Sequence, residues 1–374
     1  MKFSTFHAFM LADAKVGGAV TEGPGFNTSP AKAIQDELEL IEYADELGYG
    51  TCWVREHHFT QYGFLPNTMS LLAHAAARTE RIRLGTAVVT LPLHHPIRAA
   101  EDTALIDVLS GGRLELGVGR GYQSIEFNAF GIPLSEARAR TDESIEIMKR
   151  LWTAEGPIDF EGRFFQFRGV QLQPKPLQRP HPPIHYASIS PASIVHYARM
   201  GIPFIVDPTG TTGSIAQLAQ AWREAAKERG HAPDGDLVAC RYVWLAPTDA
   251  QARTYVDNAP PVTSLSVDPS LTPRQVDGSI AEGYEYWERG WHGRTVDHYA
   301  ADADWDDRWI AGDVERVVSG IRALERMGYA NLCVIFGLDA APAPVPEIKR
   351  RMALFAREVM PAFDPGKAPA VSLP

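Results

Sequence analysis

The stretch that decides the fold is residues 82–121, which read IRLGTAVVTLPLHHPIRAAEDTALIDVLSGGRLELGVGRG. The apolar run at 82–90 is short and rich in β-branched residues, which predicts a buried strand. Residues 96–109 carry apolar side chains at helical spacing and predict a helix, and the run at 113–118 predicts a second strand. Strand, helix and strand in this order are typical of a parallel β-α-β unit.

The same alternation continues along the rest of the chain. Eight strands are predicted, beginning at residues 2, 51, 82, 113, 184, 203, 237 and 332. Helices are expected at 30–48, 67–78, 96–109, 135–151, 191–199, 214–229, 314–327 and 346–359. Eight such units favour a (β/α)8 TIM barrel with insertions, formed by one domain over residues 1–363. The rival fold is a doubly wound sheet, but the first strand is not followed by its usual G-x-G-x-x-G.

Two segments interrupt the alternation. Residues 153–183 place glycines between aromatic pieces and then become proline-rich, which predicts a hairpin and a rigid connector. Residues 259–311 are long, irregular and aromatic, which predicts either a lid over the site or a subunit contact. Residues 364–374 are expected to form a flexible tail.

Composition and charge narrow the class of protein. The formal charge is −10, which argues against binding to nucleic acid or to an anionic membrane. Cys52, Cys240 and Cys333 lie far apart without a C-x-x-C spacing, so neither a zinc ribbon nor a disulfide framework is expected. The apolar stretch at the amino terminus is too short and interrupted for a signal peptide, and we expect a cytoplasmic protein.

In a (β/α)8 barrel the functional residues lie where strands end and loops begin. Glu56, His57, His58 and Phe59 follow the second strand. They are compatible with a metal site, but strand neighbours face opposite ways, so only Glu56 and His58 could share a metal. No second ligand cluster follows another strand, since Asp207 stands alone. The alternatives are an imidazole that acts as general acid or base, and a histidine pair that only stabilises the barrel rim.

Two further strand ends carry candidate anion-binding groups. Arg120 lies among glycines after the fourth strand, where a ligand can approach the backbone closely. Ser188, Ser190 and Ser193 follow the fifth strand and open a helix whose free N–H groups can bind an anion. A tight turn and ordinary helix capping would explain each feature separately. Because the two strands are neighbours, both features can converge on one phosphate.

The remaining candidates are apolar or unassigned. Small residues at 85–89 would let a flat ring lie against the third strand, although a buried strand alone explains them. Phe6, Phe59, Tyr242 and Trp244 are candidate walls of a substrate pocket, although aromatic residues at strand positions more often belong to the core. The histidines at 94 and 95 are interpreted as loop residues without an assigned role.

The stretches YGTCWVREHHFTQYGFLPN at 49–67 and LGTAVVTLPLHHPIRAAEDTALIDVLSGGRLELGVGRGY at 84–122 resemble the bacterial luciferase-like flavin monooxygenase family. The resemblance is greatest to its catalytic, alpha-type subunit. It is dense over 49–131, looser through 183–207 and thin at 259–311. It implies a (β/α)8 barrel that binds reduced FMN at the strand ends, with His57 as the catalytic imidazole and Glu56 and His58 beside it.

The resemblance also assigns the flavin contacts. It places Ala87 and Val88 at a non-prolyl cis peptide bond against which the flavin ring lies. It makes Arg120 a phosphate-binding residue and Ser190 and Ser193 phosphate-contacting hydroxyls. Two positions depart from the luciferase pattern, because position 119 is glycine instead of a reactive cysteine and position 189 is isoleucine instead of glutamate. These departures argue against light emission and leave the flavin selectivity open.

The residues and the resemblance together predict an FMN-dependent, two-component monooxygenase. Reduced FMN from a separate flavin reductase would react with O₂, and the resulting flavin C4a-(hydro)peroxide would insert one oxygen atom into an organic substrate. A homodimer is expected. The alternative is an F420-dependent oxidoreductase of the same superfamily, followed by a barrel metallohydrolase or a non-catalytic flavin-binding subunit.

Overall fold

The structure is a computed structural model of the full chain. It describes residues 1–9, 11, 15–16, 19–20, 29–61, 63–257, 271–275, 277–287, 308–336 and 343–364. The other residues of the 259–311 segment are not among the described residues. The same holds for residues 365–374 of the expected tail.

Eight parallel strands close into a barrel. Their hydrogen-bonded order is β10-β11-β12-β14-β1-β4-β5-β7, and β7 pairs with β10 to complete the ring. The strands are β1 (Lys2–His7), β4 (Thr51–Val54), β5 (Arg83–Thr86), β7 (Leu114–Gly119), β10 (Ile184–Ala187), β11 (Phe204–Val206), β12 (Val238–Leu245) and β14 (Asn331–Ile335). These are the eight strands that the sequence predicts, so the TIM barrel is confirmed.

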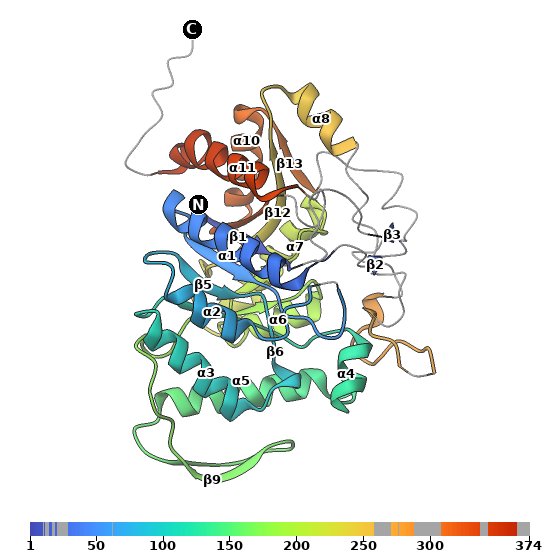
Figure 1. The fold of residues 1–374 in the computed structure, drawn as a ribbon. Coiled ribbons are helices and arrows are strands. Elements are labelled where there is room, and N and C mark those ends of the chain that lie inside the picture. The colour runs from blue at the N-terminus through green and yellow to red at the C-terminus, as the bar shows by residue number, and fades with distance from the viewer. Residues whose placement is uncertain are drawn as a thin grey trace.

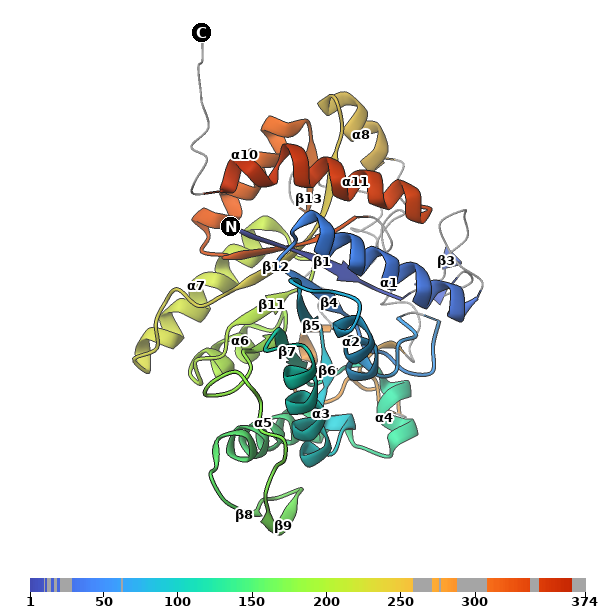
Figure 2. The same ribbon diagram turned by 60° about the vertical axis from the view of Figure 1, so that its left-hand side comes forward.

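Helices surround the strands, which lie at the centre of the view in Figure 2. The predicted helices are present as α1 (Pro30–Leu47), α2 (Thr68–Ala76), α3 (Pro96–Leu109), α5 (Ala137–Thr153), α6 (Pro191–Ala198), α7 (Thr212–Glu228), α10 (Val314–Arg326) and α11 (Val345–Glu358). Elements that the sequence analysis missed are α4 (Ser124–Phe130), α8 (Asp249–Asp257), β13 (Trp309–Gly312), the short pair β2 (Lys15–Val16) and β3 (Ala19–Val20), and the 3-10 turns η1 (Leu91–Leu93), η2 (Leu134–Glu136), η5 (Glu285–Trp287) and η7 (Met360–Phe363). Within the described residues, no helix combines the length and apolarity needed to cross a bilayer.

Local signals explain where several helices begin and end. Before α1, α2, α7 and α10 stand Ser29, Asn67, Thr211 and Asp313, and each side chain accepts a hydrogen bond from an N–H group of the first turn. Such caps satisfy donors that have no partner within the helix. The helix α1 ends at Gly48, whose φ of 83° is in the left-handed region that glycine adopts most easily.

The two largest parts of the core form two shells around the strands. The larger shell lies between the strands and the helices, and a smaller one fills the inside of the barrel with Trp53, Ile205, Val238, Cys240, Tyr242, Cys333 and Ile335. Gly85 makes room for the ring of Trp53, because a Cβ atom at position 85 would lie 2.4 Å from Cε3 of that tryptophan. The barrel interior is therefore closely packed, and function must lie at the strand ends.

The insertion at 153–183 contains the predicted hairpin, formed by β8 (Ile158–Glu161) and β9 (Gln166–Val170). It extends below α5 in Figure 1. The carboxylate of Glu143 on α5 accepts hydrogen bonds from the backbone N–H groups of residues 163, 164 and 165, which fastens the hairpin turn to the helix. The connector that follows contains cis prolines at 174 and 180.

Candidate active site

His57 lies directly after β4 and is held by a buried carboxylate. Its Nδ1 lies 3.0 Å from Oε1 of Glu126 and 3.1 Å from Nε2 of Gln123, both at the start of α4. Glu126 is 1% exposed, and the same oxygen accepts a hydrogen bond of 2.9 Å from the backbone N–H of His58. The ionised Glu126 carboxylate can only accept a hydrogen bond from Nδ1, whereas the Gln123 amide nitrogen can only donate to it. The charged carboxylate is the stronger partner and favours the tautomer in which Nδ1 carries the proton. Chemistry at His57 would then run through Nε2.

Glu56 forms a second buried cluster, next to His57. Its Oε1 lies 3.0 Å from Nε2 of His94 and 3.5 Å from Nε2 of His58, and it accepts a hydrogen bond of 3.1 Å from the backbone N–H of Thr90. Burial alone would raise the pKa of Glu56, but the hydrogen bonds and charges of the two histidines lower it to about 2. Burial would likewise lower the pKa of His94, but the contact with Glu56 raises it. Glu56 is therefore a charged carboxylate at neutral pH.

His58 lies under an aromatic surface that we call the aromatic rim, formed by Phe59 and Phe130. The imidazole packs edge-on against Phe130, with ring centres 5.3 Å apart, and lies 5.6 Å from the ring of Phe59. Phe59 is 60% exposed and Phe130 is 44% exposed. Phe59, predicted as a pocket wall, thus lies at the outer edge of the site.

The segment after β5 has the geometry that the resemblance implies for the flavin ring. The peptide bond between Ala87 and Val88 is cis, and it divides the predicted strand at 82–90 into β5 and β6 (Val89–Thr90). Gly119 of β7 faces this segment, because a Cβ atom there would lie 2.9 Å from Cγ2 of Val88. This contact gives a physical reason for glycine at position 119, where the luciferase pattern has cysteine.

Hydrogen-bond donors and hydroxyl groups gather at the start of α6. Ser190 precedes the first turn without capping it, so the N–H groups of that turn remain available to a ligand. Ser193 is fully buried, and its Oγ accepts a hydrogen bond of 3.0 Å from Nη2 of Arg138 on α5. The hydroxyl of Ser188 accepts a hydrogen bond of 3.0 Å from the backbone N–H of Ser190, which shapes the loop before the helix.

Arg120 contacts the described part of the 259–311 segment. Its Nη2 donates a hydrogen bond of 2.7 Å to the carbonyl oxygen of Gly283, and its guanidinium lies 3.8 Å from the centre of the Tyr284 ring. The hydroxyl of Tyr284 in turn donates to the carbonyl oxygen of Gly121. A hydrogen bond from Gly283 N–H lowers the pKa of Glu285, and the charges of Arg120 and Arg138 act in the same direction. Arg120 and Arg138 therefore lie near each other, and Arg138 also contacts Ser193 at the start of α6.

Two of the four expected pocket walls come together inside the barrel mouth. Phe6 and Tyr242 pack in the inner cluster with Ala87, and Tyr242 lies 5.0 Å from the ring of Trp309. Trp244 does not join them, because its ring stacks on Tyr255 of α8 at 3.1 Å and on the guanidinium of Arg351 at 3.9 Å.

The structure adds residues that the sequence analysis did not select. Glu126, Gln123, His94 and Arg138 each contact a predicted site residue, yet no local motif sets them apart. Arg138 resembles its neighbour Arg140, which instead pairs with Glu136, the last residue of η2. Among the described residues, no group of three or more His, Cys, Asp or Glu side chains is placed to hold a metal ion.

Comparison with known proteins identifies the family. The sequence profile of the luciferase-like monooxygenase family matches residues 1–331. The chain therefore belongs to this family. The 4-hydroxyprotoasukamycin monooxygenase of Streptomyces nodosus subsp. asukaensis is 31% identical over 352 residues, which cover 90% of this chain and 88% of that protein. The oxygenase component of the flavin-dependent trigonelline monooxygenase of Acinetobacter baylyi is 27% identical over 343 residues, which cover 90% and 92%.

Solved structures share the fold over nearly the whole chain. The monooxygenase RslO1 of Streptomyces bottropensis superposes with a TM-score of 0.73 at 28% identity, covering 97% of this chain and 100% of that one. The oxygenating constituent of 3,6-diketocamphane monooxygenase of Pseudomonas putida, in complex with FMN, gives 0.74 at 21% identity, covering 96% and 98%. An F420-dependent secondary alcohol dehydrogenase gives 0.69 at 15% identity, covering 96% and 98%. At these identities the last two show the fold alone.

Proposed function

We propose that this protein is the oxygenase component of a two-component, FMN-dependent monooxygenase. The observation that carries the proposal is that three features lie at the same strand ends of one barrel. They are the His57–Glu126 pair, the cis peptide segment at Ala87, and the Ser193–Arg138 pair at the start of α6. An enzyme that uses flavin mononucleotide requires a reactive side chain, a flat surface for the flavin ring and a binding site for the phosphate.

The donor set at α6 fits the phosphate of FMN. Arg138 supplies a fixed positive charge, Ser190 and Ser193 supply hydroxyls, and the first turn of α6 supplies N–H groups. Arg120 would join them from the end of β7. The cis segment at Ala87 and Val88, which faces Gly119, would hold the flavin ring. When bound, reduced FMN would supply the activation of O₂ and the transfer of one oxygen atom to an organic substrate.

The chain's own residues would control protons and water. His57 would accept or return a proton through Nε2 while Glu126 holds Nδ1 and stabilises the charged ring. Phe6 and Tyr242 would line the apolar side of the pocket that takes the substrate. The segment at 271–287, fastened to β7 through Tyr284 and Arg120, would exclude water as part of a lid.

An F420-dependent oxidoreductase is the alternative. What favours it is position 189, where isoleucine replaces the glutamate of the luciferase pattern beside the phosphate site. Anaerobic titration of the purified protein with reduced FMN and with reduced F420, followed by exposure to O₂, separates the two. Tight binding of reduced FMN and a transient flavin absorbance with O₂ are expected. Binding of F420 alone would overturn the proposal in favour of the alternative, and binding without turnover would indicate a non-catalytic subunit.

The partners follow from the same proposal. A separate flavin reductase would supply reduced FMN in the cytoplasm, and a second copy of the chain would complete a homodimer. Leu105 and Leu109 support the homodimer, because they lie one turn apart on α3 and are 45% and 57% exposed. Light scattering should give twice the chain mass, and L105E together with L109E should give a monomer. A monomeric unmodified protein would contradict this part.

A further inference from the structure

The Glu56 cluster links the solvent to the interior of the candidate site. His94 follows η1 and its side chain is 27% exposed, whereas the side chains of Glu56 and His58 are 1% and 9% exposed. One carboxylate oxygen contacts both imidazoles and the backbone N–H of Thr90. Thr90 stands two residues after the cis peptide bond. A partly exposed histidine is thus joined through one buried atom to the segment that would seat the flavin ring.

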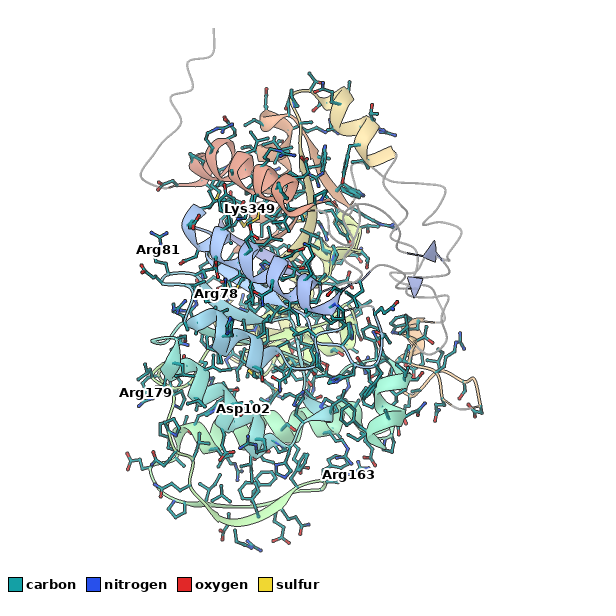
Figure 3. All side chains as sticks on the ribbon, viewed as in Figure 1. Arg78, Arg81, Asp102, Arg163, Arg179 and Lys349 are labelled. Carbon is teal, nitrogen blue, oxygen red and sulfur yellow. The ribbon has the colours of Figure 1, made fainter. Side chains whose placement is uncertain are left out.

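A buried carboxylate is stable only with a compensating charge or several donors. Oε1 of Glu56 has three donors, namely the two imidazoles and the Thr90 backbone N–H. The two imidazoles can carry a full positive charge, and His94 is the more exposed of the two. Asp102 of α3, labelled in Figure 3, adds negative charge that favours the charged form of His94. Asp102 also pairs with Arg98 at 3.7 Å, so its influence on His94 is partly offset.

We propose that His94 is a positioning residue for the flavin site. Its imidazolium neutralises Glu56 and keeps the carboxylate in place, and Glu56 then holds His58 and the Thr90 backbone. The proposal rests on the proposed function in one respect, namely that the segment at Ala87 and Val88 seats a flavin. Loss of the His94 proton would remove one of the two histidine charges that act on Glu56 and would weaken the hold of the carboxylate on the Thr90 segment.

The pKa shifts of Glu56 and His94 set the pH range in which their ion pair exists. The pKa of Glu56 is lowered to about 2, so the carboxylate stays charged above that pH. The pKa of His94 is raised above its ordinary value of 6.5, so the ion pair persists below the raised pKa and is lost as the pH rises through it. The groups that face His94 are Glu56 from the loop after β4 and Asp102 from α3, and His58 contacts the same Glu56 oxygen.

The experiment uses the full chain labelled with ¹⁵N-histidine. The imidazole signal absent from H94Q identifies His94, and its titration should give a pKa above 6.5 that falls in E56Q. This measurement needs no flavin, so it tests the ion pair even if the proposed function fails. A His94 that titrates at or below its ordinary value would overturn the proposal, whether or not H94Q folds well.

Flavin binding tests the positioning role. Binding of reduced FMN, followed by fluorescence across the pH range, should weaken in the unmodified protein as His94 loses its proton. In H94Q it should be about 2- to 30-fold weaker at neutral pH and should lose that pH dependence. The matched control is H95Q, whose native ring packs on Phe165 and caps α3. H94Q with the unmodified pH profile would refute the role, and a protein that binds no reduced flavin would refute the proposed function instead.

Discussion

Replacing Glu126 with glutamine should slow turnover while leaving the barrel folded. Glutamine keeps the size of the side chain and an oxygen that can accept the 2.9 Å hydrogen bond from His58 N–H. It removes the negative charge that faces Nδ1 of His57 at 3.0 Å, in a place where Glu126 is 1% exposed. A charge-assisted hydrogen bond contributes about 1.5–3 kcal/mol, so the rate should fall about 10- to 150-fold if His57 becomes charged in the slow step.

The assay is oxygenation of a substrate under saturating reduced FMN, with flavin affinity measured separately. The matched control is E146Q, because Glu146 lies on the surface of α5, 51% exposed and paired with Arg150. This control should leave both quantities unchanged. E126Q with control-level turnover would refute the argument that the carboxylate sets the charge and tautomer of His57. A loss of flavin affinity with unchanged turnover would give Glu126 a binding role instead.

Three further predictions test the rest of the site and the core. H57A should bind reduced FMN and fold normally but lose about 10²- to 10⁴-fold in turnover, and unchanged turnover would remove His57 from the mechanism. R138A should weaken FMN binding by about 1.5–3 kcal/mol in calorimetry while riboflavin binding stays the same, with R140A as the control; equal loss for both arginines would place the phosphate elsewhere. G85A should lower the free energy of unfolding in urea by about 1–3 kcal/mol, because its Cβ would meet Trp53; an unaffected midpoint would show that the ring can move.

The segment at 271–287 connects the two ends of the candidate site. Its Ala281 and Tyr284 pack with Phe127 and Ala137 in a small core of their own, next to the helix that carries Glu126. Tyr122 and Trp287 extend this packing toward His57, since Tyr122 lies 5.9 Å from its ring. The aromatic composition that set this segment apart in the sequence therefore serves contacts over the end of β7.

Sequence patterns predicted the barrel strands, but they missed short elements such as α4 and the contacts between elements that are distant in the sequence. The eight barrel strands are runs of apolar residues bounded by polar loops, a signal that each run carries within itself. The helix α4 has seven residues and no side-chain cap, so its local signal is weak. Its position is clear only in the folded chain, where Glu126 meets residues nearly 70 positions earlier, as the separation of 69 between His57 and Glu126 shows.

The sequence by itself determined the barrel, the strand ends that carry the histidines and serines, and the resemblance to flavin monooxygenases. Those properties depend on hydrophobic periodicity and on short motifs, which are local. Only the tertiary structure decided which of two buried carboxylates holds His57, that His94 completes the Glu56 cluster, and that Arg138 reaches Ser193. These are contacts between separate elements, and they depend on how the helices pack around the barrel. The same packing keeps Trp244 out of the inner cluster, because its ring stacks on Tyr255 and on the guanidinium of Arg351.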